Sequence, residues 1–166
     1  MHDGRVREGR NDRVEELYRE QGARLWRAVL AYTGDREVAN DAVAEAFAQI
    51  LRRGRAIRRP LPWIWRAAFR IAAGELAGRA RFADVQAGDD IEQPSEHGGF
   101  GDPSGSLMAA LRQLSPMQRG SLVLHYYAGY QMRDAARILG STSAAVRVHL
   151  SRGRRRLRLL LEEEDV

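Results

Sequence analysis

Arginines near the end of the chain have the chemistry to bind phosphate and the edges of bases. Six of them lie between residues 147 and 158, a stretch without any acidic residue: Arg147, Arg152, Arg154, Arg155, Arg156 and Arg158. The planar guanidinium group makes paired hydrogen bonds to phosphate oxygens and to guanine. Small and apolar residues recur between the arginines at helical spacing: Ala145, Val146, Leu150, Gly153, Leu157 and Leu161. We predict a helix with one packed face and one basic face, and nucleic acid is the first partner to consider.

Other residue types with useful chemistry do not form a catalytic or metal-binding arrangement. The four histidines are scattered along the chain (His2, His97, His125 and His149), and the absence of cysteine excludes disulfides, thiolate metal sites and cysteine nucleophiles. Asp41 and Glu45 stand one helical turn apart and are a candidate carboxylate pair. Adjacent acids on an exposed helix face are more often a solvated or partner-facing surface. We therefore expect no enzyme activity, no cofactor and no bound metal.

The pattern of residues 129–158 is that of a helix-turn-helix, which would position the basic helix. A short helix over 132–139 precedes Gly140, and a polar cap at Ser141, Thr142 or Ser143 follows it. The second helix of this motif contacts base edges with its N-terminal residues, and later arginines contact phosphates. A solvated basic helix is the alternative, but it leaves the turn and cap unexplained. The predicted contacts to duplex DNA are Ser141, Thr142, Ser143, Ala144, Arg147, Val148, Ser151, Arg152, Arg154 and Arg155.

A second basic stretch combines arginines with aromatic residues. Aromatic faces stack on unpaired bases while arginines follow the backbone, so this stretch is a candidate site for a single strand. Its members are Arg52, Arg53, Arg55, Arg58, Trp63, Trp65, Arg66, Phe69 and Arg70. The alternative is that the three aromatic side chains only pack in the core. Codon bias of a GC-rich genome is sufficient to explain the lack of lysine, but not where the arginines lie.

Helical periodicity and capping signals predict the remaining elements. No alternating strand pattern is present, and the predicted helices cover about 12–33, 36–53, 63–79, 107–114, 116–128, 132–139 and 143–161. We predict an all-α fold of two small helical domains joined by a flexible acidic linker. A hydrophobic content of 44% over 166 residues is sufficient for one medium core or two small ones.

Charge divides the chain into segments. Residues 1–81 hold 17 arginines and 11 acids, 82–106 hold no arginine and 6 acids, and 107–161 hold 10 arginines and a single acid. Four acids follow in 162–166. The predicted organisation is an N-terminal arm (1–11), a helical domain (12–81), an acidic glycine-rich linker (82–106), a second helical domain (107–161) and an acidic tail (162–166). We expect a cytoplasmic protein without membrane insertion, because the sequence shows no signal peptide and no apolar span.

These motifs resemble the small two-domain bacterial sigma factors of RNA polymerase, the extracytoplasmic-function (ECF) group. In the C-terminal segment the resemblance is carried by residues 114–119, 127–130, 135–140, 146–154 and Leu157, which are similar to the domain that contacts the minus-thirty-five promoter element. In the N-terminal segment it is carried by Gly34-Asp35, Ala39, Asp41-Ala42-Val43 and Glu45-Ala46-Phe47. The chain departs from the family pattern at Ala44, Arg70, Gly74, Asp134 and Gly153.

The resemblance implies partners for each segment. The helix around residues 35–49 would bind the clamp helices of the polymerase beta-prime subunit through Asp35, Asn40, Asp41, Glu45 and Gln49. Residues 52–70 would melt and capture the minus-ten element, and the C-terminal domain would contact the beta flap and the minus-thirty-five element. An anti-sigma factor is the expected inhibitor, and the linker would serve near the polymerase active-site channel or in closure on that inhibitor.

Two other functions are open at this stage. A stand-alone helix-turn-helix regulator would bind an operator as a dimer without polymerase, and a sigma-like scaffold would serve protein interaction. The N-terminal segment distinguishes a stand-alone regulator from a sigma factor, because a simple repressor would more often carry a ligand pocket or a dimer helix there. The departures at Ala44 and Arg70 favour the second alternative.

Overall fold

The computed structural model describes residues 3–86 and 104–164, and all the regular secondary structure in these residues is helical. The elements are α1 (Asp3–Thr33), α2 (Arg36–Arg53), the 3₁₀ turn η1 (Gly54–Ala56), α3 (Pro60–Gln86), α4 (Ser104–Arg112), α5 (Pro116–Leu122), the π-helical segment η2 (Val123–Tyr127), α6 (Met132–Leu139) and α7 (Ser143–Glu164). The predicted all-α fold is confirmed.

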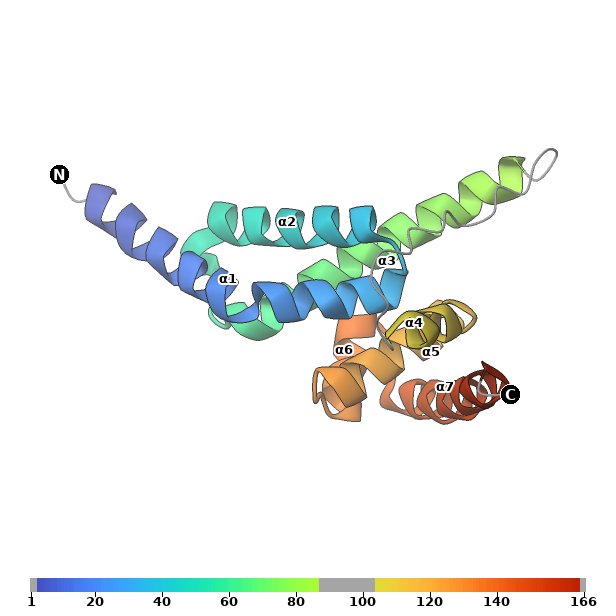
Figure 1. The fold of residues 1–166 in the computed structure, drawn as a ribbon. Coiled ribbons are helices and arrows are strands. Elements are labelled where there is room, and N and C mark those ends of the chain that lie inside the picture. The colour runs from blue at the N-terminus through green and yellow to red at the C-terminus, as the bar shows by residue number, and fades with distance from the viewer. Residues whose placement is uncertain (1–2, 87–103, 165–166) are drawn as a thin grey trace.

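The helices form two groups that lie against each other (Figure 1). In the N-terminal half, residues 3–86, α1, α2 and α3 pack on one another. In the C-terminal half, residues 104–164, α4, α5 and α6 all pack on α7. The first part of α1 and the last part of α3 extend beyond the bundle in opposite directions (Figure 1).

Two helices are longer than predicted. The first helix begins at Asp3 instead of near residue 12, so residues 3–11 are helical instead of forming an arm. The third begins at Pro60, whose fixed φ suits a first helical turn, and it continues past Gly74 and Gly78 to Gln86. Extending an existing helix costs far less than nucleating one, and a glycine lowers its stability by only about 1 kcal/mol.

The predicted linker is partly helical at both of its ends. Residues 82–86 continue α3, and α4 begins at Ser104 rather than after Ser106. The rest of the predicted linker, residues 87–103, lies outside the described residues.

Local signals at helix ends agree with the structure. Asp35 caps α2 by accepting a hydrogen bond from the Val38 backbone N–H, at 3.0 Å. Ser115 and Gln118 form a reciprocal capping box at the start of α5. Gly140 ends α6 with left-handed backbone angles, φ 64° and ψ 38°, which a residue with a side chain rarely adopts.

The predicted helix over 116–128 changes its hydrogen-bond pattern midway. After Leu122 the chain widens into the π-helical segment η2, where the Ala128 N–H donates to the carbonyl oxygen of Val123 at 3.0 Å. Such segments are rare and often mark functional positions. In this chain, η2 lies against α1.

One hydrophobic core spans both halves. It joins Leu25, Val29 and Ile64 of the N-terminal half to Leu124 and Val146 of the C-terminal half, all of them fully buried. A smaller cluster of Leu111, Leu114, Leu122 and Leu150 holds α4, α5 and α7 together. The two halves are therefore joined by buried apolar surface in addition to the chain between them.

Candidate nucleic-acid and partner-binding surfaces

The start of α7 is set by the turn that precedes it. The Ser141 N–H donates to the carbonyl oxygen of Ala136 at 2.8 Å, which closes the left-handed turn at Gly140. Thr142 then caps α7, since its hydroxyl oxygen accepts from the Ala145 N–H at 3.1 Å. Of the three residues predicted as the cap, Thr142 fills the role. Its hydroxyl oxygen is thereby engaged with the backbone, while the residue itself is exposed.

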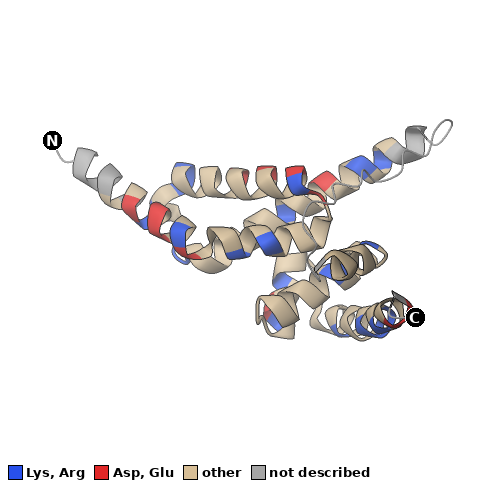
Figure 2. Cartoon of the chain, viewed as in Figure 1, with Lys and Arg blue, Asp and Glu red and all other residues tan. Residues whose placement is uncertain are grey.

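One face of α7 packs and the opposite face meets solvent. Val146, Leu150 and Gly153 are buried against the other helices, as their spacing predicts. The outward face carries the predicted duplex contacts on successive turns; all are exposed from Ala144 onward, and Ser141 and Ser143 are half-buried beside the turn. The exposed members are Ala144, Arg147, Val148, Ser151, Arg152, Arg154 and Arg155. Figure 2 shows arginines along this helix.

Close packing behind α7 explains the departure at Gly153. A Cβ atom at this position would lie 3.2 Å from Gln118 Cβ and 3.2 Å from Leu122 Cδ1, which is tighter than ordinary contact. The glycine therefore lets α7 lie close to α5. Farther out, Arg154 donates from Nη1 to the Tyr126 hydroxyl at 3.1 Å, which fixes this arginine beside η2.

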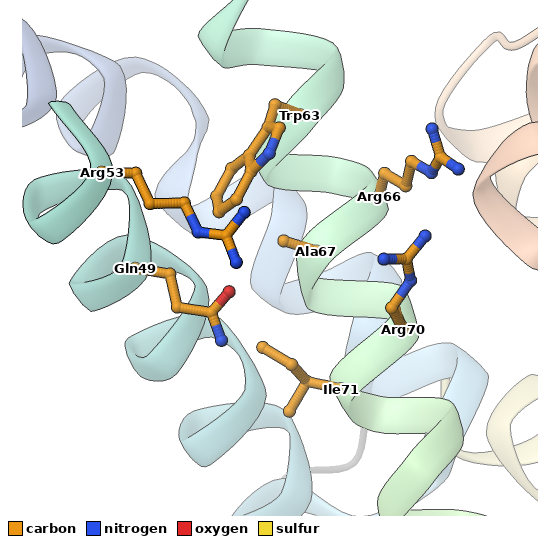
Figure 3. Close-up of a pocket in the computed structure, with 7 residues that line it drawn as sticks. All are labelled: Gln49, Arg53, Trp63, Arg66, Ala67, Arg70 and Ile71. Carbon is orange, nitrogen blue, oxygen red and sulfur yellow. The ribbon is translucent and has the colours of Figure 1, made fainter. Parts of the chain in front are cut away.

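A pocket lies between α2 and α3, within the second basic stretch (Figure 3). Its volume is about 280 Å³, and its lining combines arginine, aromatic and aliphatic side chains. The lining residues are Gln49 and Arg53 of α2 with Trp63, Arg66, Ala67, Arg70 and Ile71 of α3. Of these, Ala67 and Ile71 were not predicted as site residues.

The charged side chains of the pocket form two groups, with Arg53 beside the Trp63 ring and Arg66 and Arg70 on the other side of α3 (Figure 3). The Arg53 guanidinium lies over the Trp63 ring, 5.7 Å from its centroid. Arg66 and Arg70 lie one turn apart and extend from the same side of α3, and neither has an acidic partner among the described residues (Figure 3). Like charges at this spacing repel each other. A phosphate group would relieve that repulsion, and the exposed part of the Trp63 ring is available for stacking.

Two aromatic residues predicted to stack on unpaired bases lie in the core instead. Trp65 is 2% exposed and Phe69 is 1% exposed, so the prediction that they contact DNA is wrong for this conformation. Their rings stack on each other with centroids 6.3 Å apart, and Phe69 also stacks on Tyr32. Both residues face the bundle because α3 packs on α1 and α6 as well as on α2.

The loop between α2 and α3 keeps its predicted arginines at the surface. Arg55 and Arg58 are both exposed. Arg52, in the last turn of α2, is exposed too, but it donates to Glu45 Oε1 at 2.7 Å, so part of its charge is neutralised. This pair links the candidate DNA site to the candidate polymerase site on the same helix.

The residues expected to bind polymerase do not all share one role. Asp35 caps α2 and forms an ion pair with Arg79, and Asn40 accepts a hydrogen bond from Trp26 Nε1 at 2.7 Å. Asp41 is exposed, and its carboxylate forms no hydrogen bond or ion pair with another side chain among the described residues. Glu45 is held by Gln49 and Arg52, and these hydrogen bonds, Gln49 first, lower the pKa of its carboxyl.

No group of residues suited to hold a metal ion occurs in residues 3–86 and 104–164. Across the same described residues, none of the helices combines the length and apolar character needed to cross a lipid bilayer.

Comparison with known proteins identifies the family. Residues 104–157 match the model of sigma-70 region 4, and this segment contains the helix-turn-helix. The chain is 30% identical over 162 residues to the ECF RNA polymerase sigma factor SigL of Mycobacterium tuberculosis, covering 92% of this chain and 91% of SigL. The chain belongs to the ECF sigma factors of RNA polymerase. The resemblance seen in the sequence motifs is therefore confirmed.

Other relatives of this ECF sigma factor agree with the assignment. It is 27% identical over 168 residues to the RNA polymerase sigma factor CarQ of Myxococcus xanthus, covering 98% of this chain and 97% of CarQ. Its fold is similar to that of the sigma factor RpoE of Bartonella quintana, solved with the anti-sigma factor NepR; the TM-score is 0.71 at 21% identity, over 89% of this chain and 98% of RpoE. Its fold is also similar to that of CnrH, solved in complex with the cytosolic domain of CnrY. The TM-score is 0.64 at 19% identity, over 96% of this chain and 94% of CnrH.

Proposed function

We propose that this ECF sigma factor binds core RNA polymerase, directs it to specific promoters and enables transcription to start there. The observation that carries the proposal is the outward face of α7, where Arg147, Arg152 and Arg155 are exposed opposite the face that packs on the other helices. A helix held in this way presents its basic side to a major groove without rearranging its core. Its partner is the duplex at the minus-thirty-five element.

The pocket between α2 and α3 is proposed to hold melted DNA at the minus-ten element. Trp63 offers a ring for one unstacked base, and Arg66 and Arg70 offer charge for the neighbouring phosphates. Arg55 and Arg58 lie exposed in the adjoining loop and extend the basic surface. With Trp65 and Phe69 in the core, Trp63 is the aromatic contact in this proposal.

The exposed side of α2 is proposed to bind the clamp helices of the polymerase beta-prime subunit. Asp41 carries this assignment, because its carboxylate is exposed and unpaired among the described residues. Glu45 lies one turn farther along, where Arg52 shares its charge. Asp35 contributes by fixing the start of α2 and is not proposed as a direct contact.

Control by an anti-sigma factor is proposed from the solved relatives. RpoE and CnrH have this fold, and their structures hold NepR and the cytosolic domain of CnrY. We expect a protein of the same kind to bind this chain and to prevent its use by polymerase.

Run-off transcription with purified core polymerase and a promoter library tests the proposed function. We expect transcripts that begin at a defined set of promoters and require the full chain. Core polymerase alone is the background control, and the Asp41→Arg chain is the matched variant. If no promoter-specific transcript forms, with or without candidate partners, the proposal fails.

A further inference from the structure

We propose that the Tyr126 hydroxyl group positions Arg154 for contact with a backbone phosphate of duplex DNA. The inference rests on the proposed function, because it assigns a role within the duplex-binding surface of α7. Arg154 was predicted to contact duplex DNA from its place on the basic helix. Tyr126 lies outside that helix, in η2, and was not predicted as a site residue.

Arg154 is held by a partner from another element. Its Nη1 donates to the Tyr126 hydroxyl oxygen at 3.1 Å, which joins two residues that stand 28 positions apart in the chain. Both residues are exposed. A guanidinium group has five N–H donors, and this hydrogen bond uses one of them. Arg154 makes no other hydrogen bond within the described residues, so its remaining donors are free to bind a ligand at the surface.

The uncharged partner distinguishes Arg154 from the arginines that form ion pairs. Arg52, Arg79 and Arg137 each pair with a carboxylate, which offsets their charge. Arg154 has no acidic partner in the part of the chain that the structure describes, and a neutral phenol hydroxyl does not cancel a positive charge. Tyr126 therefore fixes the guanidinium group and leaves its full charge for an anion.

Contacts within and after η2 hold the Tyr126 ring in place. The ring meets that of His125 edge-on, with centroids 4.9 Å apart. His125 in turn donates from Nδ1 to the carbonyl oxygen of Tyr130 at 3.0 Å, since a carbonyl oxygen can only accept. The start of η2 is anchored by Val123 and Leu124, which are both buried. These supports restrict where the Tyr126 hydroxyl group lies.

Arg154 lies on the same side of α7 as the predicted base contact Arg147. Arg147, Ser151 and Arg154 follow one another at spacings of four and three residues, which places them along one side of a helix. Arg154 is two turns from Arg147, about 10 Å along the axis at about 1.5 Å per residue. When the first turns of α7 contact base edges in the major groove, we expect Arg154 to meet the phosphate backbone that borders the groove.

A guanidinium group that is already fixed binds a phosphate more tightly than a mobile one. A free arginine side chain loses rotamer freedom when it binds, and this loss of entropy weakens the contact. The hydrogen bond to Tyr126 imposes part of that restriction before DNA arrives. Orientation matters as well, because the planar guanidinium group binds phosphate through two parallel hydrogen bonds. Loss of the hydroxyl group should therefore weaken DNA binding without removing any charge.

A double-mutant cycle on the full chain tests this role. Tyr126→Phe removes the hydroxyl group and keeps the ring against His125. Arg154→Ala removes the guanidinium group, and the chain with both changes completes the cycle. Affinity for a fluorescently labelled duplex of mixed sequence is measured by anisotropy at several salt concentrations. Tyr127→Phe is the matched control, because Tyr127 is the exposed neighbour in η2 and its hydroxyl group forms no hydrogen bond among the described residues.

We expect Tyr126→Phe to weaken duplex binding about threefold to tenfold, the net effect of one hydrogen bond. In the Arg154→Ala chain the same change should alter affinity by less than about twofold, because the group that Tyr126 positions is gone. Arg154→Ala should reduce the slope of log affinity against log salt by about one unit, whereas Tyr126→Phe should keep most of the slope, since every arginine remains. Tyr127→Phe should bind like the unchanged chain.

Two results would overturn the positioning role. One is an unchanged affinity in Tyr126→Phe. The other is equal weakening by Tyr126→Phe with and without the Arg154 side chain, because Tyr126 would then act on DNA independently of Arg154. A second cycle that pairs Tyr126→Phe with Arg155→Ala should be additive. Equal thermal unfolding in all chains checks that the changes leave the fold intact.

Run-off transcription with the same chains separates this inference from the proposed function. If the two changes are coupled in duplex binding but no chain yields a promoter-specific transcript, the positioning role stands and the proposed function fails. If promoter-specific transcripts form but the two changes are additive in duplex binding, the positioning role fails and the proposed function stands. If the unchanged chain binds no duplex even at low salt and yields no transcript, both fail.

Discussion

Arg119 of α5 donates from Nε to the carbonyl oxygen of Tyr32, the last residue but one of α1, at 2.7 Å. Burial lowers the pKa of the Arg119 guanidinium, while the nearby Tyr32 phenol opposes that shift. Burial also raises the pKa of Tyr32, so the phenol stays neutral beside the cation. An arginine keeps its proton in proteins, and the interface therefore holds a fixed positive charge against helix-end carbonyl groups.

Replacing Arg119 should destabilise the fold strongly. Arg119→Met keeps the length of the side chain but leaves the carbonyl oxygens of Tyr32 and Leu114 without their donors. We expect the free energy of unfolding to fall by about 2–4 kcal/mol, as measured by urea denaturation. Arg137→Met is the control, because Arg137 is exposed and its distance to Asp134 is 3.6 Å; it should cost less than about 0.5 kcal/mol. Equal losses would contradict the structural role of Arg119.

Stability should depend on pH through Asp35. Burial acts to raise the pKa of this carboxyl, but the Val38 N–H and Arg79 outweigh it and hold the pKa below its ordinary value. As pH falls below about 4, the unfolded chain takes up this proton first, and the stability that Asp35 contributes is lost through the lower, folded-state pKa. Acid denaturation curves should therefore flatten in Asp35→Asn, which retains a capping side chain, and in Arg79→Ala. Unchanged acid denaturation curves in both variants would exclude Asp35 as an origin of the pH-dependent stability.

Glycines of α3 should be replaceable with a gain in stability. A Cβ atom added at Gly74 would meet nothing within 4 Å, and the residue is helical and exposed. Gly74→Ala should therefore raise the free energy of unfolding by about 0.5–1 kcal/mol. Gly120→Ala is the contrasting variant, since its Cβ would lie 2.7 Å from Leu139 Cδ2 and 3.3 Å from the Tyr32 ring. Thermal unfolding should shift in opposite directions for the two chains.

Two arginines of α7 should have separable effects on DNA binding. Arg147 lies in the first turns of the helix, where side chains reach base edges, so Arg147→Ala should relax the preference among promoter sequences. Arg155 lies two turns farther along the outward face. Arg155→Ala should weaken all sequences alike and reduce the slope of log affinity against log salt by about one unit. Titrations at several salt concentrations distinguish the two, and identical behaviour would contradict the placement of α7.

Reversing the charge at Asp41 should affect polymerase and leave DNA binding intact. Asp41 is exposed on α2 and the hydrogen bonds of the helix do not depend on its side chain. We expect Asp41→Arg to abolish core polymerase binding in a pull-down assay while duplex binding through α7 is unchanged. Loss of both activities together would indicate misfolding instead of a lost contact.

Short-range signals in the sequence alone were sufficient to predict much of this protein's local structure. The capping box at Ser115, the left-handed turn at Gly140 and the two faces of α7 depend on residues within a few positions of one another. Hydrogen bonds and helical periodicity at that range are expressed directly in residue order. The all-α fold, the helix-turn-helix and the family resemblance followed from these signals.

Contacts between distant segments were decided only by the tertiary structure. Trp63 and Trp65 look alike in sequence, yet Trp63 lines the pocket while Trp65 is buried, with Tyr130 against its ring. Arg119 and its acceptor Tyr32 stand 87 residues apart, and no local pattern indicates that they form a pair. Burial of a side chain depends on which surface arrives from elsewhere in the chain, and residue order does not contain that information at short range. The sequence thus determined the helices and their basic faces, and the packing of the two halves decided which of those residues are free to act.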